Sequence, residues 1–271
     1  MGFVPSTLRK MNTRLWLGLC LLLAACPERR APERGIQLVY KKARADSVRS
    51  VVDRRLAHLK LRANLSEDET TLTVRAPEGA DVTRIKALFA EAGRLEFCPE
   101  DLPIATRWCA LKWPEGVSTA TFNSTCSLRG APERLAAALV DAGIDFAVDA
   151  TQGPAAAYPL GSCFEPRIIS AELQAEPMPH IALVFDRESG RQFGEVTKAL
   201  VGHRLIIRLN GAVHSAPTVQ SAITGGKAML TVGADQNQAS MQVLAAALVG
   251  GSLPVMELLR EETWGPPAFG R

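Results

Sequence analysis

The chain has 271 residues, 47% of them hydrophobic, and 31 basic side chains nearly balance 28 acidic ones to leave a formal net charge of +3. This apolar content is enough for an ordinary hydrophobic core and excludes a disordered chain. The small net charge, the interleaved signs and the 6% aromatic content exclude the basic, aromatic surface of a nucleic-acid binder, so no nucleic-acid partner is predicted.

The N-terminus has the pattern of an export signal. Arg14 precedes the short apolar run 15–23, which is too brief to span a bilayer but has the length of a signal-peptide core. The following Leu-Ala-Ala-Cys resembles a bacterial lipobox, which predicts a signal at 1–25, acylation of Cys26 and a polar tether at 26–35. Cleavage after an Ala-x-Ala-like site is the alternative. Either reading predicts an exported protein, and the lipobox predicts a lipid anchor on the periplasmic face of the inner or outer membrane.

Four cysteines remain in the exported part, Cys98, Cys109, Cys126 and Cys163. An even number in an oxidising compartment predicts two disulfides with three possible connectivities. The nested pairing of Cys98 with Cys163 and Cys109 with Cys126 would close this segment at its base. The spacing lacks the Cys-x-x-Cys clusters of a structural zinc site, and no metal is predicted.

Residues 36–98 carry the pattern of a small α+β unit. Strands are expected at 36–40, at 61–65 with 71–76 as a hairpin, and at 94–97. A helix over 46–61 has a basic outer face and Asp46 or Ser47 as cap, and a second begins after Asp81 and stops at Gly93. The order β-α-β-β-α-β predicts a ferredoxin-like base.

Residues 99–166 interrupt this pattern as a cysteine-containing insertion. A helix is expected at 132–142 and a strand at 144–148. Trp108 and Trp113 either cover a small disulfide-stapled core or line a binding groove.

Residues 167–252 predict an α+β head with an antiparallel sheet. A strand at 181–185 and a helix at 188–201 precede a run read as three strands, with turns at Asn210-Gly211 and Gly225-Gly226. Pro217 requires the second of these strands to be an edge, bulged or interrupted. A largely buried helix follows at 238–249. The last strand, within 253–264, is expected to return to the base, so that the head is inserted before it.

Several spaced motifs occur in one order through this second half. They are Phe185-x4-Gly190-x2-Phe193-x3-Thr197, Val201-Gly202, Leu209-Asn210-Gly211-x-Val213-x-Ser215-Ala216-Pro217, Ile223-x-Gly225-Gly226, Gly251-Ser252-Leu253-Pro254 and Glu261-Glu262-x2-Gly265-Pro266. Together they resemble the first periplasmic domain of SecD, part of the membrane complex that assists Sec-dependent protein export. The runs 51–56 and 95–97 resemble the base of that domain. The insertion lies outside the resemblance.

In that family the domain sits between a first transmembrane helix and a later helical bundle that couples proton flow to movement. Here a lipobox stands in place of the first helix, and the chain ends near the point where the next membrane helix is expected. The resemblance therefore implies a stand-alone, membrane-tethered module without proton coupling. Its implied partners are unfolded or translocating polypeptide and Sec translocon subunits. The alternative is an envelope scaffold or assembly lipoprotein that binds one specific partner through the insertion.

No enzyme and no cofactor are predicted. Neighbouring strand residues His214 and Ser215 point to opposite faces, so this pair does not form a nucleophile with its base. Gly225-Gly226-Lys227 lacks the upstream glycine and the Ser or Thr of a phosphate loop, which leaves the glycines as turn residues. The interpretation that remains is strand addition of an extended polypeptide to an irregular edge of the head. The candidate residues are Val213, Ser215, Ala216, Pro217, Thr218 and Val219. The opposing possibility is an edge covered by the Gly-Gly loop or by the insertion.

Overall fold

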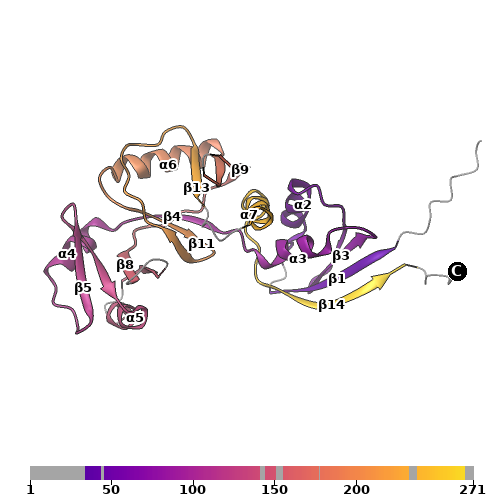
Figure 1. Cartoon of the computed structure of the whole chain (residues 1–271), viewed down its shortest axis with the longest axis horizontal. Helices are drawn as coiled ribbons and strands as arrows, with labels where there is room; N and C mark the ends of the chain where they lie inside the picture. Colours follow the sequence, from indigo (N-terminus) through magenta and orange to yellow (C-terminus); the bar gives the residue numbers. More distant parts are fainter. Residues whose placement is uncertain are drawn as a thin grey trace, which may run out of the picture.

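A computed structural model describes residues 34–43, 46–140, 144–150, 155–176, 178–231 and 237–265. These residues form four antiparallel sheets and six helices, with the base at one end of the molecule and the head and insertion at the other (Figure 1). The predicted α+β class is confirmed. The predicted signal at 1–25, the acylated Cys26 and most of the tether at 26–35 lie outside the described residues.

The base sheet has the strand order β14-β1-β3-β2, with every neighbouring pair antiparallel. Its elements are β1 (Gly35–Lys42), α2 (Arg49–His58), β2 (Asn64–Glu67), β3 (Thr71–Pro77), α3 (Val82–Ala90) and β14 (Met256–Trp264). The two helices cover one face and bury Leu38, Leu72 and Ile85 completely. The arrangement is a ferredoxin-like sheet whose fourth strand is β14, from the end of the chain.

The prediction that the strand after α3 completes the base sheet is wrong. This strand, β4 (Leu95–Pro99), instead pairs with β11 (Leu205–Leu209), with Phe97 opposite Ile207. Successive residues of β4 are buried on both faces, so the strand suits an interior position. β14 is mostly exposed and carries four charged residues, so it suits the solvated edge beside β1.

One helix cap differs from the sequence prediction. Helix α2 has Val48 as its N-cap with no side-chain cap, and neither Asp46 nor Ser47 fills that position. The carboxylate of Glu67 accepts hydrogen bonds from the Val48 amide (2.9 Å) and the Ser47 hydroxyl (2.7 Å). Asp81 caps α3 as predicted, accepting from the Arg84 amide at 3.0 Å.

The head contains two small sheets in place of the single one predicted over residues 204–233. Its elements are β9 (Ile168–Gln174), β10 (His180–Phe185), α6 (Arg187–Ala199), β11, β12 (Ala212–Ser215), β13 (Lys227–Thr231) and α7 (Gln238–Gly250). Strand β13 pairs with β10 in the order β13-β10-β9, whereas β12 and β11 form a sheet with β4. Between β12 and β13 the chain passes Pro217, whose carbonyl accepts from the Leu205 amide, and this detour separates the third strand from the hairpin.

The hairpin turn itself is confirmed. Asn210 and Gly211 both have positive φ values, 53° and 86°, as a type I′ turn requires. The side chain of Asn210 also accepts from the Arg94 amide, which ties the turn to the start of β4.

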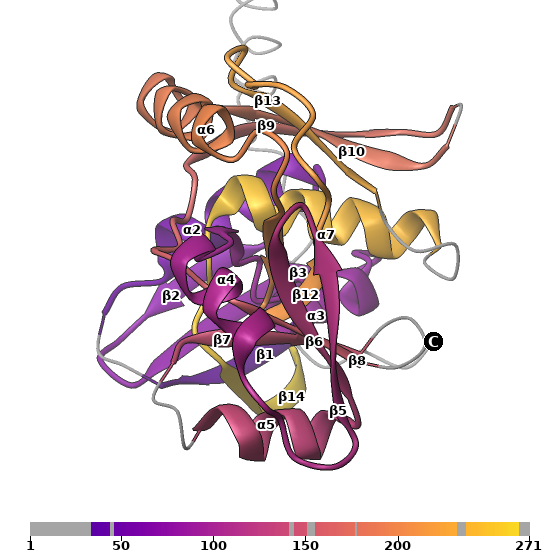
Figure 2. The ribbon, with the colours of Figure 1, turned by 90° about the vertical axis from the view of Figure 1, so that its left-hand side faces the viewer.

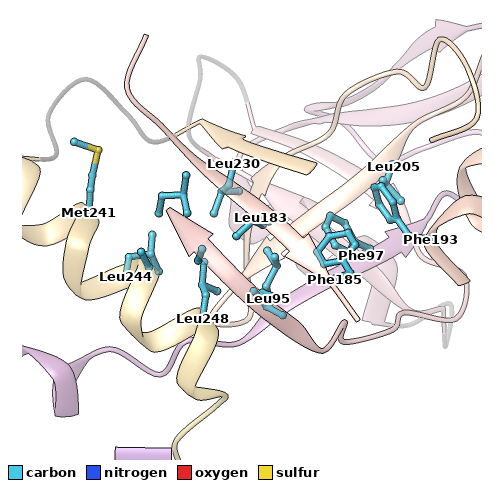
Figure 3. Packing of buried hydrophobic residues seen from close by; sticks show 14 of the residues in the cluster. Leu95, Phe97, Leu183, Phe185, Phe193, Leu205, Leu230, Met241, Leu244 and Leu248 are labelled. Atoms are coloured by element: carbon cyan, nitrogen blue, oxygen red, sulfur yellow. The ribbon is translucent and has the colours of Figure 1, made fainter. Parts of the chain in front are cut away.

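The head core is built around three phenylalanines that pack together (Figure 3). The Phe193 ring lies 4.7 Å from that of Phe97 and 5.2 Å from that of Phe185. Helix α7 adds Leu244 and Leu248 to this core from one side and Val243 and Ala246 to the base core from the other. The helix is therefore shared by base and head, which explains why it is apolar nearly all round.

The insertion forms a four-stranded sheet in the order β5-β6-β8-β7 (Figure 2). Its elements are α4 (Leu102–Ala110), β5 (Val117–Phe122), β6 (Thr125–Gly130), α5 (Pro132–Val140), β7 (Phe146–Asp149) and β8 (Ala155–Pro159). The cysteines are paired Cys98–Cys163 and Cys109–Cys126, which is the nested arrangement. Trp108 is fully buried and its ring packs edge-on against Trp113, so the tryptophans form core.

Removing the two disulfides separately is expected to lower stability by different amounts. Cys109→Ser/Cys126→Ser frees a crosslink spanning 17 residues, and Cys98→Ser/Cys163→Ser frees one spanning 65. Loop-closure entropy predicts losses of about 3 and about 4 kcal/mol in unfolding free energy. Urea unfolding followed by circular dichroism measures both, and equal losses would contradict the entropic ordering.

Candidate functional site

The predicted polypeptide-binding residues lie on β12 and the segment that follows it. Val213 and Val219 are each only 6% exposed and belong to the core. Ser215, Ala216 and Thr218 are half-buried, and Pro217 is exposed. The accessible part of the predicted set is therefore the short stretch from Ser215 to Thr218.

Backbone hydrogen bonds already hold the end of this stretch, since the Pro217 carbonyl accepts from the Leu205 amide and the following Val219 is bonded on both sides. Val219 donates to the carbonyl of His203 at 2.9 Å and accepts from the amide of Gly202 at 2.8 Å, so the segment pairs with the loop after α6. On the other side of β12, Val213 packs in one cluster with Ala147 of β7. The insertion therefore lies against β12. This is the possibility of a covered edge that the sequence left open.

His214 and Ser215 do not form a catalytic pair. The imidazole Nε2 of His214 lies 2.6 Å from the carbonyl oxygen of Thr231. This contact joins β12 to the end of β13 and leaves the Ser215 hydroxyl without the histidine as its base.

The Gly225-Gly226 turn lets the loop before β13 pack closely against α6. A Cβ atom on Gly190 would lie 3.0 Å from the Cα of Gly226, and Gly226 has a φ of 61°. The hydroxyl of Thr197 accepts from the Ile223 amide at 3.0 Å and anchors the loop from the same helix. These glycines thus hold a close helix–loop contact.

An open surface lies instead on the outer face of the sheet β13-β10-β9 and along its terminal strand β13, up to the Thr231 carbonyl that contacts His214. Met229 on β13 is 71% exposed and stands opposite Ala182 of β10, which shares its face with half-buried Val184. The core-facing residues of the same strands are Leu230 and Leu183. Sequence reasoning overlooked Met229, although an apolar residue at a solvent-facing position of an alternating strand was a usable signal.

A second feature missed in the sequence is the buried side chain of Arg55 on α2. The predicted basic outer face of this helix is wrong for Arg55, which has no exposed surface. Its guanidinium donates to the carbonyls of Leu88 (2.7 Å), Glu91 (2.5 Å), Ala92 (2.7 Å) and Gly251 (2.7 Å). Spacing of four residues from Val51 was the available sign that Arg55 points inward.

Burial lowers the pKa of Arg55 to about 10, with the charge of Glu91 opposing this shift. The guanidinium is therefore protonated at neutral pH and acts as a buried cation among carbonyl dipoles. Its neighbour Arg54 donates two hydrogen bonds to the carbonyl of Gly250, at 2.8 and 3.2 Å. Both arginines thus hold the point at which the chain passes from α7 back to the base.

Beside these arginines a hollow of about 640 Å³ separates base from head. Arg54 lines it from the base, Arg167 and Ile169 from the head, and Val249 from α7. Ile169 is 57% exposed. The hollow combines cationic and apolar groups but brings together no set of catalytic residues.

The described residues lack both a metal-ligand cluster and a membrane-spanning helix. Among them, no three His, Cys, Asp or Glu side chains gather as metal ligands. None of the helices in the described ranges is long and apolar enough to cross a bilayer.

The fold is similar to that of two solved SecDF structures. A SecDF crystal structure in a "Super-membrane-facing form" superposes with a TM-score of 0.59 at 20% identity, covering 93% of this chain and 34% of that one. A second structure, titled as a membrane component SecDF that enhances protein export, gives 0.54 at 20% identity, with 83% and 98% covered. At 20% identity, these two superpositions show only that the chain shares its fold with SecDF structures.

The sequence comparisons are more specific. Residues 166–255 match the family model "SecDF, P1 head subdomain". The protein translocase subunit SecDF of Thermus thermophilus is 42% identical over 77 residues, which is 28% of this chain and 10% of that protein. The SecD subunit of Magnetococcus marinus is 34% identical over 126 residues, 43% of this chain and 23% of that protein. Residues 166–255 thus correspond to the head of a SecD-family periplasmic domain, and the chain spans a quarter or less of these relatives' length.

Replacing Arg55 is expected to destabilise the junction strongly. Arg55→Met removes the donor of the Leu88, Glu91 and Gly251 carbonyls, while the Ala92 carbonyl keeps the Leu253 amide. The unfolding free energy should fall by about 3 kcal/mol or more, since each buried orphan acceptor costs about 1–3 kcal/mol. Arg49→Met on the same helix is the control, because Arg49 is exposed and makes only a 3.7 Å contact with Asp53. Urea unfolding compares the two, and equal effects would contradict the role given to Arg55.

Proposed function

We propose that this protein assists Sec-dependent protein export by holding extended polypeptide on its head at the periplasmic face of a membrane. The proposed anchor is the acylated Cys26, and the proposed partners are translocating polypeptide and Sec translocon subunits. The proposed contribution is binding, with no catalysis and no proton-coupled step. Its main support is the open face and edge of β13 within the segment that matches the SecDF P1 head.

The chemistry of this face suits a client of varying sequence. Strand β13 ends its sheet, so a polypeptide added beside it would bind through backbone hydrogen bonds, which depend little on side chains. Met229 is flexible and polarisable and adapts to different apolar partners. The accessible Pro217 and Thr218 of the sequence-based set lie on the same lobe and are included in the proposed surface.

The scaffold alternative has weaker support. Exposed tryptophans in the insertion would favour it, but Trp108 is fully buried and its carbonyl accepts from the indole nitrogen of Trp113 at 3.1 Å. Capture of one discrete envelope protein by the insertion is therefore kept as the contrary outcome of the test.

Site-specific photo-crosslinking in the native host tests the proposal. A benzophenone amino acid is placed at Met229 and at Thr218 in the head. The probe in the insertion is placed at Val140, which is 67% exposed, because Trp113 packs against the core. Crosslinks from the head to many newly exported chains or to Sec subunits are expected. Silence of both head probes, with one discrete partner at Val140, would show that the export role is wrong.

Substituting the exposed methionine should weaken client binding without affecting the fold. Met229→Glu places a charge on the proposed face, and the affinity for a reduced, alkylated polypeptide is expected to fall at least fivefold. Leu259→Glu is the matched control, since Leu259 is 46% exposed on β14 of the base. Both variants should unfold within about 0.5 kcal/mol of the parent protein. Fluorescence anisotropy measures the affinity, and an equal loss in both variants would contradict the assignment.

A further inference from the structure

One edge of the insertion sheet is a strand without charged residues and without a neighbouring strand on its outer side. β5, Val117–Phe122, is the terminal strand of the sheet β5-β6-β8-β7 and lies at the front of Figure 2. Its sequence is Val-Ser-Thr-Ala-Thr-Phe, with no charge and no proline. Ser118, Thr119 and Thr121 are exposed, and the other three residues are half-buried. Such an edge is a template for pairing with another strand.

The hairpin geometry shows which backbone groups of β5 point outward. Asn123 and Ser124 have φ values of 45° and 65° and form a two-residue turn between Phe122 and Thr125. In such a hairpin the closing pair is hydrogen-bonded, and hydrogen-bonded pairs then alternate along the ladder. Ala120 and Ser118 therefore bond to β6, while the amides and carbonyls of Thr119 and Thr121 face away from it.

Each of the other terminal strands in the described sheets carries a charged residue or lies against another element. β13, the proposed site in the head, carries its charge at its first residue, Lys227. Charged side chains stand on β14, β2, β13, β9, β4 and β7, for example Glu257, Glu67, Lys227, Glu172, Glu96 and Asp149. β12 has no Asp, Glu, Lys or Arg, but it lies against the insertion. Within the described part of the chain, β5 alone combines an uncharged sequence with a free side.

The same strand is fixed to the proposed client surface of the head. The side-chain amide of Asn123 donates to the carbonyl of Gly202 at 2.6 Å. The guanidinium of Arg204 lies 4.7 Å from the ring centroid of Phe122, and the main chain of Arg204 forms a β-bridge with Thr218. The end of β5 is thus joined through residues 202–204 to exposed Pro217 and half-buried Thr218.

We propose that the free edge of β5 is a second strand-addition site, which binds an uncharged, β-prone segment of the same extended polypeptide held by the head. This inference rests on the proposed function and extends it to the insertion. The outward groups of Thr119 and Thr121 supply the backbone hydrogen bonds. The small hydroxyl and methyl side chains of β5 accept Val, Thr, Ser and aromatic residues as cross-strand neighbours and offer no partner to a buried charge.

The test uses the full protein with a benzophenone amino acid at Thr121. Its partner is a fluorescein-labelled ten-residue peptide of alternating valine and threonine. A crosslinked product is expected with this peptide. The yield should fall at least tenfold when the peptide is N-methylated at alternate residues, because N-methylation removes donors but keeps the side chains. A peptide of alternating lysine and glutamate should give at least tenfold less product than the uncharged one.

Two variants of the protein refine the test. Thr119→Pro removes an outward amide and should reduce the yield at Thr121 at least tenfold, whereas the isosteric Thr119→Val keeps the amide and should leave the yield unchanged. Retention of both disulfides and of the circular dichroism spectrum shows that the proline variant is folded. The N-methylated peptide tests the same hydrogen bonds without any mutation.

Three outcomes would overturn the inference. They are no product at Thr121, equal products from the plain and N-methylated peptides, or crosslinking only to a second copy of the chain, which would make β5 a self-association edge. A probe at Met229 separates this failure from that of the proposed function. If Met229 captures client while Thr121 does not, only the β5 site is wrong, whereas silence at both positions rejects the proposed function as well.

Discussion

The guanidinium of Arg55 is the constraint on which the arrangement of base and head depends. The last turn of a helix leaves carbonyls without partners, and Arg55 supplies donors to three of them at and beyond the end of α3 and to one just after α7. A cation at the carboxyl ends of two helices also complements their dipoles. The chain leaves the base after α3 and re-enters it after α7, so one side chain holds both crossings.

The glycines at these crossings belong to the same constraint. A Cβ atom on Gly250 would lie 2.3 Å from Cγ of Arg55, and one on Gly93 would lie 2.7 Å from the carbonyl oxygen of Ala247. Close packing of α7 against both crossings therefore requires glycine at each. Because α7 also contributes side chains to both cores, base and head share a helix as well as a junction.

Much of the local structure could be predicted from the sequence, because it depends on residues near one another. The Asn210-Gly211 turn, the Asp81 cap and the apolar helix α7 follow from backbone preferences and periodicity. What failed depended on distant partners. β4 is as apolar as a base strand, and only β11, more than a hundred residues later, shows that it belongs to the head. Ser47 has a suitable side chain for a cap, but in the structure its hydroxyl donates to Glu67. The Glu67 carboxylate also accepts from the Val48 amide, so it takes the place of the cap.

The insertion was hardest to predict, since its small elements gain their stability from crosslinks and contacts. Helix α4 begins with Leu102 and Pro103 and carries a tryptophan and a cysteine, a weak helical signal, and it is held by the Asp101 cap and the Cys109–Cys126 bridge. The free edges of β5 and β13 could not be predicted either, because the sequence of a strand does not show which of its two sides another strand will cover.

Under the proposed function, the packing of the insertion determines which edges of the head a client can reach. By lying against β12 it removes the edge that sequence motifs made the natural candidate, and by docking Asn123 on Gly202 it brings its own bare strand to the same region of the head. An edge that is covered needs no protective charge, and β12 has none; an edge that is free normally carries one, and β5 does not. Retaining an uncharged free edge beside the head makes sense only if pairing there is useful, since unintended pairing is the cost that edge charges prevent. The insertion thus covers one edge of the head and, under the proposal, adds a second binding edge beside it.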